Sequence, residues 1–276
     1  MNRPIFTSTA EYYAQFRPAY PAAMLDDLVR LSVGTHGRHV VDLGCGTGEV
    51  ALPLSRAFDT VTAIDADPAM VALARRKADR QAIGNVTWLV GPAETLELAD
   101  GSADLVVAGS SFHWMDRRLL SARARDWLTG TGVVAVLGGG SDVWDVRTEW
   151  HAVAVRTIQR YLGQERRAGN QAFGVTGRHG DFLTEAGFSL RTRQYETETV
   201  WTTDRIVGYL YSTSFASPAV LGDQRDAFER DLRQGLHELS PGGTFPEVLS
   251  FYSIVGRREP DGAHASAGAD NPADAG

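Results

Sequence analysis

Cysteine, lysine and long apolar runs are scarce in this sequence of 276 residues. The single cysteine, Cys45, can form neither an internal disulfide nor a metal site built from several thiolates, which agrees with a reducing compartment. No apolar run approaches the roughly 18 residues that a membrane span requires, and the opening stretch MNRPIFTSTAEYY lacks the apolar core of a secretory signal. We therefore expect a cytoplasmic protein with no membrane partner and no metal.

Basic residues are also fewer than acidic ones. The sequence has 27 basic and 34 acidic residues, a net charge of −7, and a single lysine, Lys77. No basic cluster offers a footprint for a phosphate backbone, so we expect no nucleic-acid partner. The preference for arginine over lysine, with abundant Ala and Gly, suggests a GC-rich bacterial genome. With 43% hydrophobic residues, the chain can bury a sizeable core in one or two domains.

Short β-branched runs alternate with amphipathic helical patterns in the first half of the chain. The predicted strands cover residues 39–43, 60–64, 86–90, 104–108 and 133–137. Helical patterns cover residues 67–80 and 116–128, and Asp67 followed by Pro68 is a strong helix start. Such alternation predicts an α/β fold with a doubly wound parallel sheet.

After residue 137 the pattern changes. We expect a helix over 146–162, a polar, glycine-rich segment over 163–180, and strands over 188–201 and 248–258 with helices over 203–215 and 222–239 between them. The tail 259–276 has no apolar periodicity and is predicted to be disordered. We therefore predict one domain over residues 1–258.

The stretch VVDLGCGTGEV, residues 40–50, forms the first predicted turn from strand to helix. Gly44, Gly46 and Gly48 let a ligand touch the backbone there. A dinucleotide fingerprint needs G-x-G-x-x-G, but position 49 is Glu. A carboxylate beside a pyrophosphate would be repulsive by about 1 kcal/mol or more. The pattern disfavours NAD, and an NAD-dependent oxidoreductase remains a weaker alternative.

A cationic, zwitterionic ligand without phosphates suits this loop better. VVDLGCGTG resembles the first motif of the class I, seven-strand S-adenosylmethionine-dependent methyltransferases. The resemblance implies a Rossmann-like seven-stranded sheet with an antiparallel last strand and S-adenosylmethionine as cofactor. It also implies that Asp65, in VTAIDADPAM, binds the ribose hydroxyls, and that Ala93 and Glu94, in GPAETLEL, hold the adenine. The alternatives are that the aspartates are local caps or turn formers, and that Glu94 belongs to a solvated acidic loop.

Upstream, EYYAQFRPAYP resembles the amino-terminal segment of a subgroup that methylates small acids and other metabolites. That resemblance implies that Tyr13 and Arg17 close over the methionine end of the cofactor, with Arg17 pairing its carboxylate. The alternative is an aromatic helix that packs on the sheet. The cofactor-binding residues predicted altogether are Tyr13, Arg17, Asp42, Gly44, Cys45, Gly46, Asp65, Ala66, Ala93, Glu94 and Ser110.

The acceptor side is predicted from LVVAGSSFHWMD and from the segments after residue 140. His113 is either a general base, since imidazole titrates near neutral pH, or a structural side chain. Asp116 is expected to cap the next helix. Substrate contacts are predicted for Trp144, Tyr209, Ser212 and Phe215, although an aromatic stripe at helical spacing can equally be core.

The other histidines and several arginines also concern the acceptor side. Five other histidines are expected to be structural or solvated: His39, His151, His179, His237 and His264. Aromatic residues suggest an acceptor with apolar bulk, whereas several arginines would allow a carboxylate: Arg156, Arg160, Arg178 and Arg191.

The predicted function is transfer of a methyl group from S-adenosylmethionine to O, N or C of a small-molecule metabolite. The cofactor half would cover about residues 36–140, and a roof over the acceptor would come from residues 1–35 and 141–250. A protein that binds S-adenosylmethionine as a scaffold or sensor without methylating is the main alternative, because it needs the same motifs. The acceptor and the oligomeric state stay open.

Overall fold

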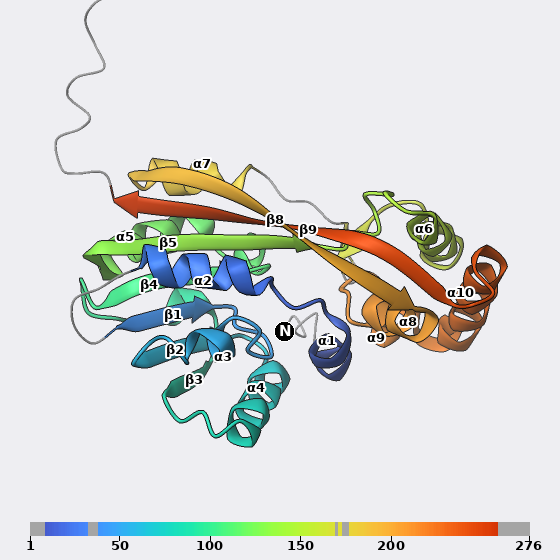
Figure 1. Ribbon diagram of the computed structural model, residues 1–276, viewed down its shortest axis with the longest axis horizontal. Coiled ribbons are helices and arrows are strands. Elements are labelled where there is room, and N and C mark those ends of the chain that lie inside the picture. Colours follow the sequence, from blue (N-terminus) through green and yellow to red (C-terminus); the bar gives the residue numbers. More distant parts are fainter. Residues whose placement is uncertain (1–8, 33–37, 169–170, 173–176, 259–276) are drawn as a thin grey trace, which may run out of the picture.

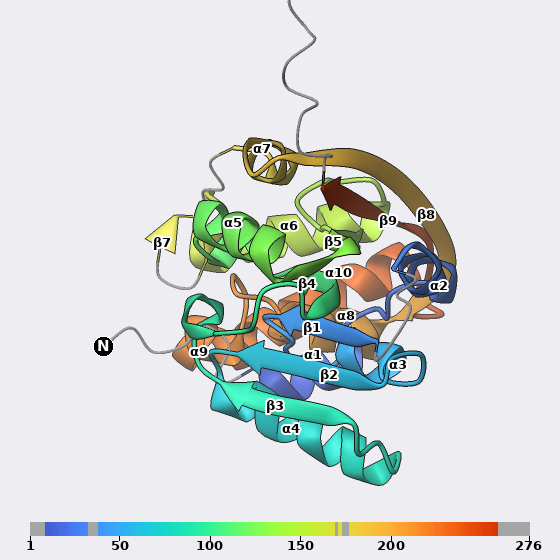
Figure 2. The same ribbon diagram turned by 90° about the vertical axis from the view of Figure 1, so that its left-hand side faces the viewer.

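The computed structural model describes residues 9–32, 38–168, 171–172 and 177–258. Within these ranges seven strands form one sheet in the order β3-β2-β1-β4-β5-β9-β8, and a separate two-stranded sheet pairs β6 with β7. Figure 2 shows β3 and α4 at one edge of the large sheet and β8 at the other. The predicted disordered tail lies outside the described residues. The strands are β1 (His39–Leu43), β2 (Thr60–Asp65), β3 (Val86–Val90), β4 (Ala103–Gly109), β5 (Leu128–Gly140), β6 (Arg167–Ala168), β7 (Gln171–Ala172), β8 (Phe188–Thr202) and β9 (Thr244–Arg258).

Strands β1 to β5 are parallel to one another, and β9 is antiparallel to both β5 and β8. Both faces of the central parallel strands are buried: Val40 and Val41 are fully buried in two different apolar cores. This explains the nearly continuous apolar runs of the central strands. The predicted α/β fold with an antiparallel final strand is confirmed.

The helices flank the sheet and fill its right-handed connections. They are α1 (Ala10–Phe16), α2 (Ala22–Leu31), α3 (Ala51–Leu54), α4 (Pro68–Arg80), η1 (Ala93–Thr95), η2 (Phe112–Trp114), α5 (Arg117–Trp127), α6 (Glu149–Leu162), α7 (His179–Glu185), α8 (Thr203–Tyr211), α9 (Pro218–Leu221), η3 (Gly222–Gln224) and α10 (Arg225–Leu239). Two predicted caps are confirmed: Asp67 accepts the N–H of Ala69 at 2.8 Å, and Asp116 accepts that of Leu119 at 3.0 Å. Among the described helices, none has the length and apolar character that crossing a bilayer would need.

Strands β8 and β9 are 15 residues long and stay paired over their whole length, from Phe188 opposite Arg258 to Thr202 opposite Thr244. β5 accompanies β9 only as far as Gly140, opposite Ser250. The rest is a two-stranded ribbon that reaches about 20 Å past the sheet at roughly 3.4 Å per residue. Figure 1 shows it running toward α6, α8 and α10. We call this outer ribbon (residues 197–202 and 244–249), together with α1, α6, α8, α9, α10 and the connecting segments 141–148, 163–166 and 212–217, the roof.

Two strands extend well beyond their predicted ranges. β5 extends beyond 133–137 because it includes glycines at both ends, which weaken the strand signal. β9 begins at Thr244 rather than at residue 248, because Pro246 and a buried acid, Glu247, interrupt its apolar alternation. Phe245 and Leu249 are nevertheless buried, so the inward face of β9 continues into the roof.

Candidate cofactor and acceptor site

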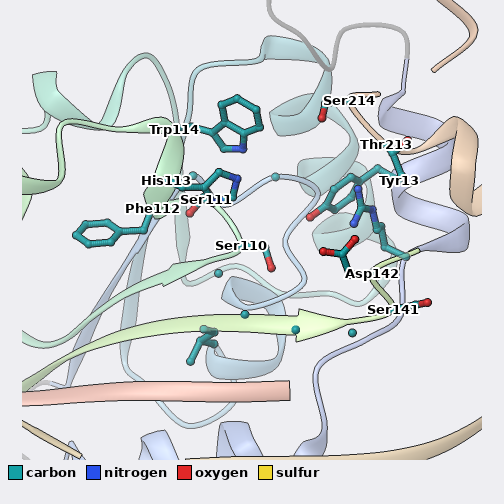
Figure 3. A pocket seen from close by; sticks show the side chains of 18 of the residues that line it. Tyr13, Ser110, Ser111, Phe112, His113, Trp114, Ser141, Asp142, Thr213 and Ser214 are labelled. Atoms are coloured by element: carbon teal, nitrogen blue, oxygen red, sulfur yellow. The ribbon is translucent and has the colours of Figure 1, made fainter. Parts of the chain in front are cut away.

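A cavity of about 1510 Å³ lies at the carboxyl ends of β1, β2, β4 and β5 and continues beneath the roof. Single drug-sized ligands usually occupy pockets of about 300 to 1,000 Å³, so this volume has room for a cofactor and an acceptor together. In Figure 3, His113 and Trp114 lie on one side of the cavity and Tyr13 and Thr213 on the other. A single cavity is therefore lined by both the cofactor half and the roof, which the sequence predicted as separate regions.

The glycine loop forms one wall of the cavity. Backbone N–H groups of Gly44 and Cys45 donate to the carbonyl of Ile64 at 2.8 and 3.0 Å, which fixes the loop to β2. Gly44 has a φ of +69°, and a Cβ there would lie 2.5 Å from that of Ser111. Gly46 also has a positive φ, but a Cβ there would meet nothing closer than 3.8 Å. Gly44 thus serves the fold of the loop, whereas Gly46 leaves open space facing the cavity.

Asp65 ends β2 and lines the cavity. Its carboxylate accepts the backbone N–H of Gly46 and that of Asp67, each at 2.8 Å. Burial raises the pKa of Asp65, and these two N–H groups oppose the shift. An ionised carboxylate can accept about four hydrogen bonds, so a fixed acceptor with capacity for two more donors remains. Two vicinal hydroxyls match that capacity.

Asp42 and Cys45 do not line the cavity. Asp42 is buried beneath the loop, and neither of its carboxylate oxygens has a hydrogen-bond partner of normal geometry among the described residues. Burial, with the charges of Asp65 and Glu49, raises its pKa to about 8, opposed by the nearby backbone of Ala51. Burial likewise raises the pKa of the Cys45 thiol well above its usual value. Both residues support the loop from below.

Glu49 is not the bare carboxylate that its position suggested. Its Oε1 binds Nζ of Lys77 at 2.7 Å and the hydroxyl of Thr47 at 2.6 Å. This ion pair partly offsets the charge, so the electrostatic case against a pyrophosphate is weaker than the sequence implied. The distinction from a dinucleotide-binding loop therefore rests on the spacing of the glycines.

The segment after β3 supplies the predicted adenine contacts. Ala93 is buried in η1, and both Ala93 and Glu94 line the cavity. Oε1 of Glu94 accepts the N–H of Asp116 at 2.8 Å, and Arg123 donates to the Glu94 carbonyl at 2.5 Å. These contacts tie the segment to α5 and leave Oε2 for a ligand.

Ser110 follows β4 in a backbone conformation with φ at +51°, which is costly for a residue with a side chain. Its hydroxyl lies 2.9 Å from that of Tyr20, and the neighbouring Ser111 donates to the carbonyl of Leu43 at 2.6 Å. Such local strain is common at ligand sites. Sequence reasoning missed Tyr20, although it lies in the quoted amino-terminal motif.

Tyr13 and Arg17 approach the cavity from α1. The Arg17 guanidinium lies 5.0 Å from the ring of Tyr13 and 5.2 Å from that of Tyr209, and it donates to the Ser212 carbonyl at 3.3 Å. Among the described residues it makes no ion pair. Tyr12 instead packs edge-on against an aromatic ring of α8. Each of the two predicted alternatives therefore applies to one tyrosine. Tyr12 packs against the protein, and Tyr13 faces the cavity.

His113 lines the cavity in η2, and a second histidine stands beside it. Burial lowers the pKa of His113 to about 4, with smaller contributions from His179, Arg117 and Arg166. This corrects the expectation of titration near neutral pH. The ring of His179, expected to be structural or solvated, lies 6.2 Å from that of His113 and also lines the cavity. At pH 7 His113 is therefore an uncharged imidazole.

The roof contributes two of the four predicted substrate residues. Tyr209 and Phe215 line the cavity, whereas Ser212 is fully buried and Trp144 packs edge-on against Phe215. Tyr209, Ser212 and Phe215 do not share one helix face, because α8 ends at Tyr211.

Other polar side chains reach the cavity from the roof. The arginines that line it are Arg17, Arg147 and Arg166, not the four that the sequence suggested. Ser141, His151 and Glu247 also line it and were missed, because each is isolated in the sequence. Within the described ranges, no three His, Cys, Asp or Glu side chains come together as a metal site would require.

Comparisons with known proteins agree with this geometry. Residues 40–132 match the family model described as "Methyltransferase domain". A probable S-adenosylmethionine-dependent methyltransferase of Saccharomyces cerevisiae is 26% identical over 45% of this chain and 43% of its own length. An uncharacterized methyltransferase of Mycobacterium bovis is 29% identical over 78% of this chain and 79% of its own length.

The fold agrees as well. The structure of a candidate type II methyltransferase from Anaeromyxobacter dehalogenans superposes with a TM-score of 0.59 at 24% identity, covering 88% of this chain and 98% of that one. Taken with the sheet order and the glycine loop, these matches identify the class: the chain carries a methyltransferase domain over residues 40–132 and has the fold of the class I S-adenosylmethionine-dependent methyltransferases. Its methyl donor is S-adenosylmethionine.

Proposed function

We propose that this enzyme methylates O, N or C of a small metabolite held in the inner part of the cavity. The observation that carries the proposal is one cavity lined both by the glycine loop with Asp65 and by roof residues such as Tyr209 and Phe215. An acceptor beneath the roof would lie beside the cofactor within the same cavity. The cysteine usage and the arginine bias support a bacterial cytoplasm as its location.

The residues at the cavity wall fit S-adenosylmethionine. Asp65 would accept the ribose hydroxyls, Ala93 and Glu94 would hold the adenine, and Arg17 would pair the methionine carboxylate. Two observations support this fit: a Cβ on Gly46 would fill the cradle, and Arg17 has no ion pair among the described residues. Six acidic side chains against three arginines line the cavity, which favours a cationic cofactor. Asp42 and Cys45 would act only through the loop.

Bound S-adenosylmethionine supplies an electrophilic methyl group on a sulfonium. The protein's task is to align the acceptor atom at about 3 to 3.5 Å and in line with the bond that breaks. Transfer to the acceptor would leave the bonding electron pair on sulfur, so the cofactor would depart as S-adenosylhomocysteine. If the acceptor is a hydroxyl or an amine, His113 would take its proton, because the neutral imidazole is available at pH 7.

Two measurements test the proposal in sequence. Calorimetry should detect binding of S-adenosylmethionine and of its demethylated product, S-adenosylhomocysteine, and no comparable binding of NAD; preference for NAD would overturn the assignment. Incubation with methyl-labelled cofactor and a metabolite extract, followed by mass spectrometry, should then give a labelled product and name the acceptor. Tight cofactor binding without any labelled product across a broad extract would favour the scaffold or sensor alternative.

A further inference from the structure

A buried acid interrupts the apolar face of β9 inside the roof. Phe245, Leu249 and Phe251 are buried along this face, and Glu247 occupies the same face with its side chain 5% exposed. A carboxylate at such a position costs stability unless it is paired and hydrogen-bonded. Because Glu247 also lines the cavity, a ligand can complete its bonding.

Two neighbours hold this carboxylate. Nε2 of His151 lies 3.3 Å from Oε1 of Glu247, and the hydroxyl of Ser141 donates to Oε2 at 3.3 Å. Ser141 and His151 are 2.9 Å apart, and all three side chains are buried. Tyr209 donates to the carbonyl of Ser141 and fixes its backbone. We call Ser141, His151 and Glu247 the roof cluster.

The roof cluster is not a nucleophilic triad. In a triad the carboxylate binds one ring nitrogen and the serine binds the other. Here both lie at Nε2 of His151, and the backbone N–H of Arg147 donates to Nδ1 at 3.3 Å. Since Nδ1 accepts a hydrogen bond, the proton of the neutral ring is on Nε2. With a single ring proton, His151 supplies no positive charge to set against the carboxylate charge of Glu247.

The arginines at the cavity do not neutralise this charge. Arg147 is 2.5 Å from Asp145, and Arg166 is 3.0 Å from Asp142, so each is paired with its own aspartate. Arg17 makes no ion pair with Glu247, and in the proposed function it meets the cofactor carboxylate. The acceptor part of the cavity thus presents an anion without a matching cation among the described residues.

We propose that the roof cluster binds a protonated amine of the acceptor, so that the acceptor is a cationic molecule with apolar bulk rather than a carboxylic acid. An ammonium supplies hydrogen-bond donors to the spare lone pairs of Glu247, while Tyr209 and Phe215 contact the apolar part. A carboxylate would meet like charge at the same place. This inference rests on the proposed function, because it assumes that the acceptor lies beneath the roof.

Three probes of matched shape test it: phenethylamine, 2-phenylethanol and phenylacetate, titrated by calorimetry into the full chain saturated with S-adenosylhomocysteine. Hydrogen bonds to charged groups contribute about 1.5 to 3 kcal/mol, so phenethylamine should bind about 10-fold or more tighter than 2-phenylethanol, with phenylacetate weakest. Glu247→Gln should bring the amine within about threefold of the alcohol and leave S-adenosylhomocysteine affinity unchanged.

Glu198→Gln is the matched control. It removes the same charge from an exposed position on β8, opposite Val248, and should keep the full preference for the amine. Phenylacetate binding as tightly as phenethylamine, no binding of phenethylamine, or an unchanged preference in Glu247→Gln would each overturn the inference. Loss of S-adenosylhomocysteine affinity in Glu247→Gln would assign the carboxylate to the cofactor and also overturn it.

The comparison of the three probes on the unsubstituted protein remains decisive if Glu247→Gln does not fold. Probe binding needs no turnover. A failed methyl-transfer screen therefore counts against the proposed function and a failed probe preference against the roof cluster.

Discussion

The cofactor half and the roof build their parts of the cavity in different ways. In the cofactor half, backbone groups hold the functional side chains: Asp65 is fixed by two N–H groups, and the glycine loop is fixed by the carbonyl of Ile64. In the roof, side chains hold one another, and Ser141 meets Glu247 across 106 residues of sequence. A backbone-held site accepts few substitutions, whereas side-chain contacts can be exchanged singly. In the proposed function, this difference would keep the methyl donor constant while the contacts to the acceptor change.

The largest expected effect comes from the loop. Gly44→Ala would force a side chain into a positive φ and against Ser111, and we expect it to destabilise the protein by about 2 to 5 kcal/mol and to abolish cofactor binding. Gly46→Ala should cost only the roughly 1 to 2 kcal/mol of a left-handed backbone, less than Gly44→Ala, and should weaken S-adenosylmethionine binding because its Cβ enters the open space of the cavity. Gly130→Ala, with open space and a negative φ, is the control. Thermal melts with calorimetry separate these cases; equal behaviour of Gly44→Ala and Gly130→Ala would contradict the loop geometry.

His113 should give the next largest effect, on turnover. If it takes a proton from the acceptor, His113→Ala should lower kcat by about 10² to 10⁴. Because its pKa is about 4, the rate should rise with pH only through the acid range and stay flat around neutral pH. His237→Ala, on the surface of α10, should leave kcat unchanged. A change in KM alone would indicate positioning, and unchanged kcat, KM and pH profile would exclude His113 from the chemistry.

Asp65 tests whether the two halves are energetically separate. Asp65→Ala removes a charge-assisted hydrogen-bond acceptor and should weaken S-adenosylmethionine binding by about 1 to 3 kcal/mol. Phe215→Ala, in the roof, should leave that affinity unchanged and weaken acceptor binding instead. Calorimetry on both variants makes the comparison. Loss of cofactor affinity in Phe215→Ala would show that the halves are coupled through the ligand pair.

The last prediction concerns Asp42 and the pH dependence of stability rather than ligand binding or turnover. Its folded pKa of about 8 lies above its ordinary value of 3.8, so between these two values the unfolded chain releases a proton that the folded protein keeps. The stability contributed by Asp42 is therefore lost as pH rises through this window. In thermal melts, Asp42→Asn should lack this part of the decline, whereas the exposed Asp100→Asn should retain it. An identical pH dependence in both variants would show that Asp42 is ionised throughout.

The same contrast explains which features the sequence could predict. Gly44, Asp65 and the Asp67 cap act within a few residues of a strand end, so their spacing predicts where they lie. Glu247 and His151 act through partners that are far away in the chain, and no local pattern distinguishes them from solvated residues. Ser212 fails for a different reason: the end of α8 turns it into the interior. Strand order could be predicted by resemblance, but the length of the β8–β9 ribbon could not.

The ion pair between Lys77 and Glu49 has one further consequence. Lys77 provides the only ε-amine of the chain, and Glu49 and Thr47 hold it next to the glycine loop with its side chain 20% exposed. An amine-acylating reagent at mild pH therefore has a single side-chain target. Mass spectrometry of that one labelled position therefore reports on the ion pair beside the glycine loop without an engineered probe.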